Sequence, residues 1–316
     1  MMPGRILITG AGGFTGGHAC RHFSAAGWEV VAAVSPRSRA CKLDARETAS
    51  CELTDGEAAA ELVRRVRPDA VLHLAGRNAV DASWKAPAAS LAANLMSTAY
   101  LLEAVRSLGT GRVLVVGSMI GADESRLSEA AHPYGFSKAL QVAASVAWSR
   151  WYELPVMIAE PSNLIGPGCS SGLCGKIARW AAAAEEAEGR LPPFALSSLR
   201  ESRDFLDVRD AVEGYERVIR DGVPGERYAL ESGTFRTLEE VKRTFDESTA
   251  TALPWTVGSG SPAPSPTARD TSSIRKLGWA PKRAFRQSIR DALEEERRRR
   301  RRERERGGSP FRSESS

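Results

Sequence analysis

The sequence predicts an α/β fold: a doubly wound, mainly parallel sheet flanked by helices, with a smaller, discontinuous second lobe. Three observations lead to this prediction. An apolar run, a glycine cluster and a helical pattern follow one another over residues 6–16, in the order of a strand–turn–helix unit. Further strand and helix patterns alternate after it, as parallel βαβ units require. Beyond Asn163 the periodicity weakens, which indicates a separate lobe.

Glycines occupy the first predicted turn, in the segment I-L-I-T-G-A-G-G-F-T-G. Gly10, Gly13 and Gly16 lack a Cβ where the backbone turns sharply, where a pyrophosphate approaches, and where the helix packs on the strand. A glycine-rich turn without a ligand is the alternative interpretation. The strand before the turn and the helix after it favour a dinucleotide at the helix N-terminus.

The end of the second predicted strand, residues 28–34, bears on the choice of dinucleotide. A site that prefers NAD usually has an acid about 20 residues beyond the glycines, where it holds the ribose 2′-hydroxyl. This chain has Ser35 there, with Arg37 and Arg39 just beyond. A hydroxyl and two guanidinium groups suit a 2′-phosphate. We therefore expect NADP(H), with NAD as the alternative.

Two later strands end in residues that fit a ligand site. The strand over residues 70–74 ends in H-L-A-G, whose small residues leave room for a cofactor at the sheet edge. His73 itself is typical of a packed or hydrogen-bonding histidine. The strand over 112–116 is followed by Gly117 and Ser118. Ligands of open α/β sheets bind at the carboxyl ends of strands, so Ser118 is well placed for chemistry.

A tyrosine and a lysine lie four residues apart in H-P-Y-G-F-S-K, which begins a predicted helix towards Trp151. At this spacing, Tyr134 and Lys138 project from one helical face. An ammonium beside a phenol favours the phenolate, so we expect the pKa of Tyr134 to lie below its usual value of about 10. A surface tyrosine and a solvated lysine are the alternative.

These motifs together resemble the extended short-chain dehydrogenase/reductase family, which comprises nucleotide-sugar epimerases, dehydratases and reductases. The resemblance rests on T-G-A-G-G-F-T-G, H-L-A-G, Ser118, Y-G-F-S-K, E-P-S-N-L-I-G-P-G, R-D-F-L-D-V-R-D and L-G-W-A-P, and it covers nearly all of residues 4–293. It implies a Rossmann-type dinucleotide domain at 1–163 and 205–232. The nucleotide-sugar lobe would comprise 164–204 and 233–293.

Site residues follow from the same resemblance. It implies that Ser118, Tyr134 and Lys138 are catalytic and that Asn163, Arg203 and Arg269 bind the nucleotide sugar. The cofactor residues that we expect are Gly10, Gly13, Phe14, Thr15, Gly16, Ser35, Arg37, Leu53, Leu74, Ala75, Gly76 and Lys138. No metal site is expected, because Cys169 and Cys174 have no further ligands nearby.

Three reactions compete within this family: 4-keto reduction, 4-epimerisation and 4,6-dehydration. Dehydratases of the family resemble one another in an acidic residue directly after the catalytic serine or threonine, where this chain has Met119 and Ile120, and Asp123 and Glu124 come later. The closest likeness is to the GDP-4-keto-6-deoxymannose reductase branch, and we expect reduction of an NDP-4-keto-6-deoxyhexose. Glu52 and Glu160 depart from the family pattern. A redox sensor that binds NADP(H) without catalysis is the non-enzyme alternative.

Composition limits the remaining possibilities. The net charge of +5 is concentrated in residues 297–306, whose eight arginines and two glutamates carry +6 and leave −1 for the rest. We therefore expect no nucleic-acid partner, and a disordered charged tail at 297–316. Five scattered cysteines and the lack of a long apolar run favour a cytoplasmic protein without a membrane segment. The family resemblance implies a homodimer.

Overall fold

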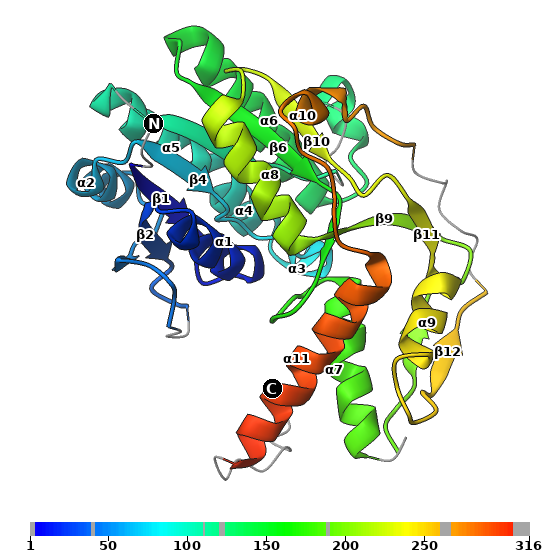
Figure 1. Ribbon diagram of the computed structural model, residues 1–316. Coiled ribbons are helices and arrows are strands. Elements are labelled where there is room, and N and C mark those ends of the chain that lie inside the picture. The colour runs from blue at the N-terminus through cyan, green and yellow to red at the C-terminus, as the bar shows by residue number, and fades with distance from the viewer. Residues whose placement is uncertain are drawn as a thin grey trace. The chain divides into compact units, whose positions relative to one another are not determined.

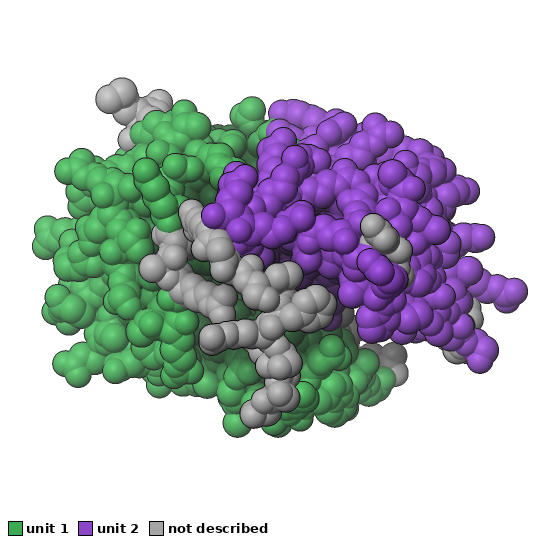
Figure 2. All heavy atoms as spheres, turned by 90° about the horizontal axis from the view of Figure 1, so that it is seen from below, with its two compact units in different colours: residues 1–162, 208–231, 269–281 green, residues 163–207, 232–268, 282–316 purple. Residues whose placement is uncertain are grey.

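The computed structural model describes residues 4–38, 42–109, 111–119, 124–187, 190–259 and 267–305. The chain divides into two compact units, which are coloured separately in Figure 2. Unit 1 contains residues 1–162, 208–231 and 269–281, and unit 2 contains residues 163–207, 232–268 and 282–316. The sequence places 269–281 in the substrate lobe, but this segment belongs to unit 1, because its helix α10 (Ser272–Lys276) packs against strand β10 (Arg227–Leu230).

A parallel sheet forms the centre of unit 1 (Figure 1). Within the described residues it has seven strands in the order β10-β6-β5-β4-β1-β2-β3. Ile6, Leu7 and Ile8 of β1 have no exposed surface, as is typical of parallel strands that are covered on both faces. The strands are β1 (Arg5–Thr9), β2 (Glu29–Val34), β3 (Glu47–Ser50), β4 (Ala70–His73), β5 (Arg112–Val116), β6 (Val156–Pro161) and β10 (Arg227–Leu230).

Helices cover both faces of this sheet, as the doubly wound prediction requires (Figure 1). On one face α5 packs against α2 and α6, and on the other α1 packs against α8. Residues 87–108 form a continuous helical run that contains a π-helical turn at Ala92–Met96. The helices are α1 (Phe14–Ala25), α2 (Gly56–Val66), α3 (Val80–Lys85), α4 (Pro87–Leu91), α5 (Ser97–Leu108), α6 (Pro133–Tyr152) and α8 (Val208–Asp221).

Unit 2 has its own apolar core, built on a small sheet in the order β11-β9-β7 and on three helices. Fully buried Ile177, Phe245 and Ile289 belong to this core, one from each helix. A second pair of strands, β8 and β12, is parallel. The elements are β7 (Asn163–Ile165), α7 (Leu173–Glu186), β8 (Phe194–Leu196), β9 (Ser202–Asp207), β11 (Phe235–Thr237), α9 (Leu238–Asp246), β12 (Trp255–Val257) and α11 (Phe285–Glu305).

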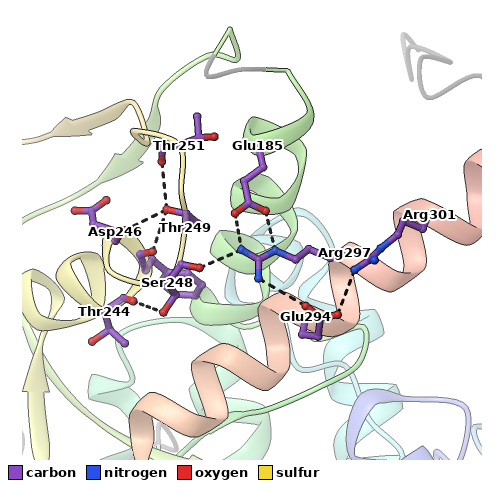
Figure 3. A network of polar contacts seen from close by, with 10 residues as sticks. Glu185, Thr244, Asp246, Ser248, Thr249, Thr251, Glu294, Arg297 and Arg301 are labelled. Carbon is purple, nitrogen blue, oxygen red and sulfur yellow. Dashed lines mark hydrogen bonds and ion pairs between the residues drawn. The ribbon is translucent and has the colours of Figure 1, made fainter.

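The last helix corrects the prediction of a disordered tail from residue 297. Helix α11 runs to Glu305, and residues 306–316 lie outside the described residues. Arg297 donates to Glu185 of α7 at 2.8 Å and to the carbonyl oxygen of Ser248 at 3.0 Å (Figure 3). Arg300 and Arg304 pair with Glu186 in the same way. The arginine run is therefore partly neutralised by acids of another helix, which supports the helical conformation.

Candidate active site

Three glycines at the carboxyl end of β1 leave open backbone for a phosphate. Gly10 has a positive φ of 66°, and a Cβ on it would lie 2.7 Å from the amide nitrogen of Ala75. A Cβ on Gly16 would lie 2.6 Å from Cα of Ala11, so only glycine lets α1 start this close to the turn. Gly13 is the N-cap of α1, and no side chain caps its first turn. The free N–H groups of such a turn suit a pyrophosphate, so the chain fits a dinucleotide here.

The loop after β2 lies beside this glycine turn. A Cβ on Gly12 would come within 2.6 Å of the Ser38 hydroxyl oxygen. The Ser35 hydroxyl accepts a hydrogen bond from the Arg37 amide at 3.3 Å, so its own proton stays available for an acceptor. The Arg37 guanidinium lies 3.5 Å from a carboxylate oxygen of Glu52, and the Arg37 side chain is 88% exposed. Arg39 lies outside the described residues.

The other expected cofactor residues divide into two groups. Phe14 and Thr15 form the first turn of α1 and are half-buried. Leu74 and Ala75 follow β4 directly, and Gly76 beyond them is exposed. These residues line the carboxyl edge of the sheet near the glycine turn. Leu53, by contrast, is 8% exposed and packs in the apolar core of unit 1.

Ser118, Tyr134 and Lys138 meet where β5 ends against α6. Ser118 lies two residues beyond the end of β5 and is hydrogen-bonded to the Tyr134 side chain. The Lys138 ammonium donates to the carbonyl oxygen of Val116, the last residue of β5, at 2.8 Å. The sequence spacing therefore does bring the two hydroxyls and the ammonium to one edge of the sheet.

The electrostatics of this group differ from the expectation. Burial raises the pKa of Tyr134 above its usual value, and the hydrogen bond with Ser118 offsets part of that rise. Burial also lowers the pKa of Lys138, to about 7. The sequence argument that the lysine lowers the pKa of the phenol does not hold for the chain by itself, because the phenol is only 6% exposed and desolvation dominates. Tyr134 therefore keeps its proton at neutral pH.

The three expected substrate residues are divided between the two units. Asn163 begins β7 in unit 2, and its amide donates to the carbonyl oxygen of Asp204 at 2.9 Å. Arg203, in the neighbouring strand β9, donates to Glu201 at 2.8 Å. Arg269 belongs to unit 1, where its guanidinium donates to the buried carboxylate of Glu160 at 2.7 Å.

The comparisons with known proteins agree with this arrangement. A model of the NAD dependent epimerase/dehydratase family matches residues 6–230. The chain belongs to this family. It is 28% identical to the GDP-6-deoxy-D-mannose reductase of Pseudomonas aeruginosa over 92% of its own length and 97% of that protein. It is 26% identical to the dTDP-glucose 4,6-dehydratase of Shigella flexneri, over 92% of each chain.

A solved structure extends the likeness to three dimensions. RMD from Pseudomonas aeruginosa, complexed with NADPH, matches with a TM-score of 0.78 and 26% identity, over 93% of this chain and 99% of that one. The epimerase/dehydratase family and the parallel sheet predicted from sequence are both confirmed.

This family member also carries a buried polar network that sequence reasoning did not assemble. Gln141 of α6 accepts from the Lys138 ammonium at 2.7 Å and donates to Thr98 of α5 at 2.8 Å. Thr98 in turn contacts His73, and Asn94 donates to Ser137 at 2.8 Å. All of these except Lys138 have no exposed surface, and Lys138 has 4%. The only local indication of the contact is that Gln141 is polar and lies three residues after Lys138, on the same face of α6.

Clusters of metal ligands and membrane-spanning helices are both absent from the described part of the chain. There, no group of three or more His, Cys, Asp or Glu side chains is arranged to hold a metal ion. Over the same ranges, no helix has the length and apolar character to cross a membrane. Ile120 and Asp123, which bear on the choice between reductase and dehydratase, lie outside the described residues, and Glu124 begins a 3₁₀ helix (Glu124–Glu129).

Proposed function

We propose that this protein is an NADPH-dependent reductase that reduces the C4 keto group of an NDP-4-keto-6-deoxyhexose. The observation that carries the proposal is the hydrogen-bonded pair of Ser118 and Tyr134, with the buried Lys138 one helical turn further on. The reductase from Pseudomonas aeruginosa supports it as a relative over nearly the whole chain. The dTDP-glucose 4,6-dehydratase relative is also named for a nucleotide sugar, which supports this class of substrate.

The chain's own groups supply the proton chemistry of such a reduction. Bound NADPH would deliver a hydride to the C4 carbonyl carbon. Tyr134 would protonate the developing alkoxide, and burial suits it to this role because the phenol retains its proton at neutral pH. Ser118 would hydrogen-bond the same oxygen, so the charge of the transition state would meet two preplaced donors. Lys138 would hold the nicotinamide ribose.

The loop after β2 supports NADPH over NAD. Ser35 and Arg37 follow the strand directly, and the Arg37 guanidinium is exposed enough to turn from Glu52 towards a 2′-phosphate. The structure of RMD from Pseudomonas aeruginosa contains NADPH. We assign Gly10, Gly13, Phe14, Thr15, Gly16, Leu74, Ala75 and Gly76 to the rest of the cofactor. Leu53 would contribute through backbone only, because its side chain is in the core.

The proposal also assigns the substrate residues and chooses among the competing reactions. Asn163 and Arg203 would contact the sugar nucleotide, and Arg269 would do so if it exchanged Glu160 for a diphosphate oxygen. Met119 directly follows Ser118 and offers no acid for the elimination of water. This favours reduction over 4,6-dehydration. A 4-epimerase remains the alternative, and the family name supports it.

The decisive assay incubates the purified protein with NADPH or NADH and with GDP-, dTDP- and UDP-linked 4-keto-6-deoxy sugars, and follows the absorbance of reduced nicotinamide. We expect NADPH to be oxidised with one of these sugars, and Tyr134→Phe to bind NADPH but to lose turnover by a factor on the order of 10² to 10⁴. NAD found tightly bound to the purified protein, with no oxidation of either cofactor, would move the assignment to epimerase. Binding of NADPH without turnover of any keto sugar would favour the redox sensor.

We further propose a cytoplasmic homodimer. Cys51, Cys169 and Cys174 are free thiols, which suits a reducing compartment, and Cys41 lies outside the described residues. Exposed Met96 lies at the start of the α5 helical run, and exposed Trp151 and Tyr152 end α6. These apolar surfaces support pairing through α5 and α6. Light scattering at micromolar concentration measures the oligomeric state, and a monomer there would contradict the dimer.

A further inference from the structure

The Lys138 ammonium is a buried cation whose described acceptors are both neutral. It donates to the carbonyl oxygen of Val116 at 2.8 Å and to Oε1 of Gln141 at 2.7 Å. Val116 offers a backbone atom of β5, which any residue there would present. Gln141 offers a side chain with no exposed surface, one turn further along α6. Gln141 is therefore the residue whose side chain accepts a hydrogen bond from the ammonium.

The orientation of the Gln141 amide follows from its second partner, Thr98. The Thr98 hydroxyl has one proton, which it donates to the carbonyl oxygen of Asn94 at 2.7 Å. It must therefore accept from its two other neighbours, Nε2 of Gln141 and Nε2 of His73, each at 2.8 Å. Because the amide nitrogen faces Thr98, the amide oxygen faces Lys138.

The far end of the network fixes the same arrangement. Because Nε2 of His73 donates to Thr98, Nδ1 of His73 must accept, and it does so from the Thr9 hydroxyl at 2.8 Å. Burial and the Lys138 charge lower the pKa of His73 to about 3, so the ring is neutral. Thr9 and Ala75 close the chain at the cofactor edge of the sheet, where the Ala75 amide donates to Thr9 at 3.3 Å.

From this geometry we propose that Gln141 is a positioning residue, which orients the Lys138 amine and stabilises its charged form in a site that otherwise desolvates it. The inference rests on the proposed function for the role of Lys138 in turnover. Gln141 would not touch substrate or cofactor. It would act through Lys138, and through Lys138 on the Tyr134 phenol.

The neighbouring ionisable groups in the described part of the chain do not supply a free negative charge that would stabilise the Lys138 ammonium in place of Gln141. His73 on β4 is neutral, and the Tyr134 phenol keeps its proton. Glu160 on β6 is engaged by two arginines, Arg227 and Arg269. Among the described residues, the other ionisable groups on helices packed against α6 include Tyr100 and the Glu103–Arg106 pair of α5, Asp81 and Lys85 of α3, and Glu129 of the 3₁₀ helix Glu124–Glu129. Glutamine therefore stabilises the ammonium by a dipole, without supplying a counter-charge.

Two substitutions of Gln141 test the proposal, one that removes the hydrogen-bond acceptor and one that gives it a negative charge. Gln141→Met keeps a similar volume and removes the acceptor, so the charged lysine loses stabilisation and its pKa should fall. Gln141→Glu supplies a carboxylate, so the pKa of Lys138 should rise. Ser145→Ala is the matched control, because Ser145 is buried on the same helix and donates to the backbone oxygen of Gln141. We expect a shift of about one pH unit in opposite directions for the two variants, and none for the control.

The measurement is a pH titration of the full chain labelled with [¹³C]lysine, followed by NMR at the ε-carbon, with and without NADPH. The chain has seven lysines, and the signal of Lys138 is the one that disappears in Lys138→Met. Shifts of opposite sign would support the proposal. No shift, or shifts of one sign in both variants, would overturn it, because loss of packing alone has no reason to change sign with the charge. If Gln141→Met does not fold, the rise in Gln141→Glu decides alone.

Turnover separates this inference from the proposed function. If the protein reduces a keto sugar, the pH profile of kcat should move in the direction of the lysine pKa in each variant. If the protein reduces none, the proposed function fails, but the titration still decides whether Gln141 controls Lys138. A reductase with unmoved lysine titrations would keep the function and overturn the inference.

Discussion

Two buried ionisable side chains of unit 1, Lys138 and Glu160, have opposite surroundings. Lys138 donates to two neutral oxygens, and burial lowers its pKa to about 7. Glu160, which is 3% exposed, accepts from the guanidinium groups of Arg227 and Arg269, each at 2.7 Å. Both residues lie at the carboxyl edge of the same sheet, since Glu160 is in β6 and Lys138 contacts the end of β5.

The difference indicates that the Glu160 charge stabilises the fold, whereas the Lys138 charge serves the proposed reaction. A buried carboxylate that is paired and hydrogen-bonded holds its neighbours in place, and removing it leaves their charges without a partner. A buried amine without a counter-charge costs stability, and proteins tend to keep such groups where the perturbed titration serves a reaction. We therefore expect substitutions of Glu160 to act on stability and substitutions of Lys138 to act on turnover.

Lys138→Met should produce the largest effect. Turnover should fall by a factor on the order of 10³, because a group that orients the cofactor and the proton donor is lost. The free energy of unfolding should change by less than about 1 kcal/mol at pH 7, since lost hydrogen bonds offset the relief from desolvation. Urea unfolding and the keto-sugar assay measure both quantities on one preparation.

The stability comparison for Lys138 also has a pH dependence. The folded pKa of about 7 lies below the usual lysine value of 10.5, so the unfolded chain binds more protons between these values. Wild type should therefore gain stability relative to Lys138→Met as pH rises from about 7 towards 10.5. A loss of several kcal/mol in Lys138→Met at pH 7 would show that the lysine is structural and would remove the contrast with Glu160.

Glu160→Gln should have the next largest effect, on stability. The substitution leaves two guanidinium groups facing an amide, and we expect a loss of about 3 kcal/mol in the free energy of unfolding. Glu103→Gln is the control, because Glu103 forms an ion pair with Arg106 on the surface and should cost less than about 0.5 kcal/mol. Equal losses in the two variants would mean that burial does not distinguish Glu160.

Local features of this fold could be predicted from the sequence. A positive φ requires glycine at position 10, where a Cβ would also meet the backbone of Ala75 after strand β4. At position 16, a Cβ would meet the backbone of Ala11 a few residues earlier. The four-residue spacing of Tyr134 and Lys138 places both on one face of α6, and Ser118 follows from the end of β5. Most of these depend on short-range geometry, which residue order determines directly; the contact between Gly10 and Ala75 is the exception.

Features that depend on distant partners could not be predicted. The contact between Gln141 and Thr98 crosses from α6 to α5, and Arg269 meets Glu160 across 109 residues. Composition alone predicts disorder for the arginine run of α11, because the partner of Arg300 and Arg304, Glu186, lies on α7. Spacing predicts a lowered pKa for Tyr134, because it shows the nearby lysine but does not show the burial. Tertiary contacts decided each of these outcomes.

The smallest expected effect on the free energy of unfolding is at Glu216 of α8, a carboxylate whose partners should make stability depend on acid pH. Burial raises its pKa, but hydrogen bonds from His22, Arg220 and Trp28 outweigh burial and hold the pKa at about 2. The folded value lies below the usual 4.5, so the stabilisation is complete above pH 4.5 and is lost as pH falls towards 2. In urea unfolding at pH 5, the free energy of unfolding of wild type should exceed that of Glu216→Gln by on the order of 2 kcal/mol. The two free energies should converge near pH 2. A difference that stays constant over this range would show that packing between α1 and α8, rather than the carboxylate charge, provides the stabilisation at this site.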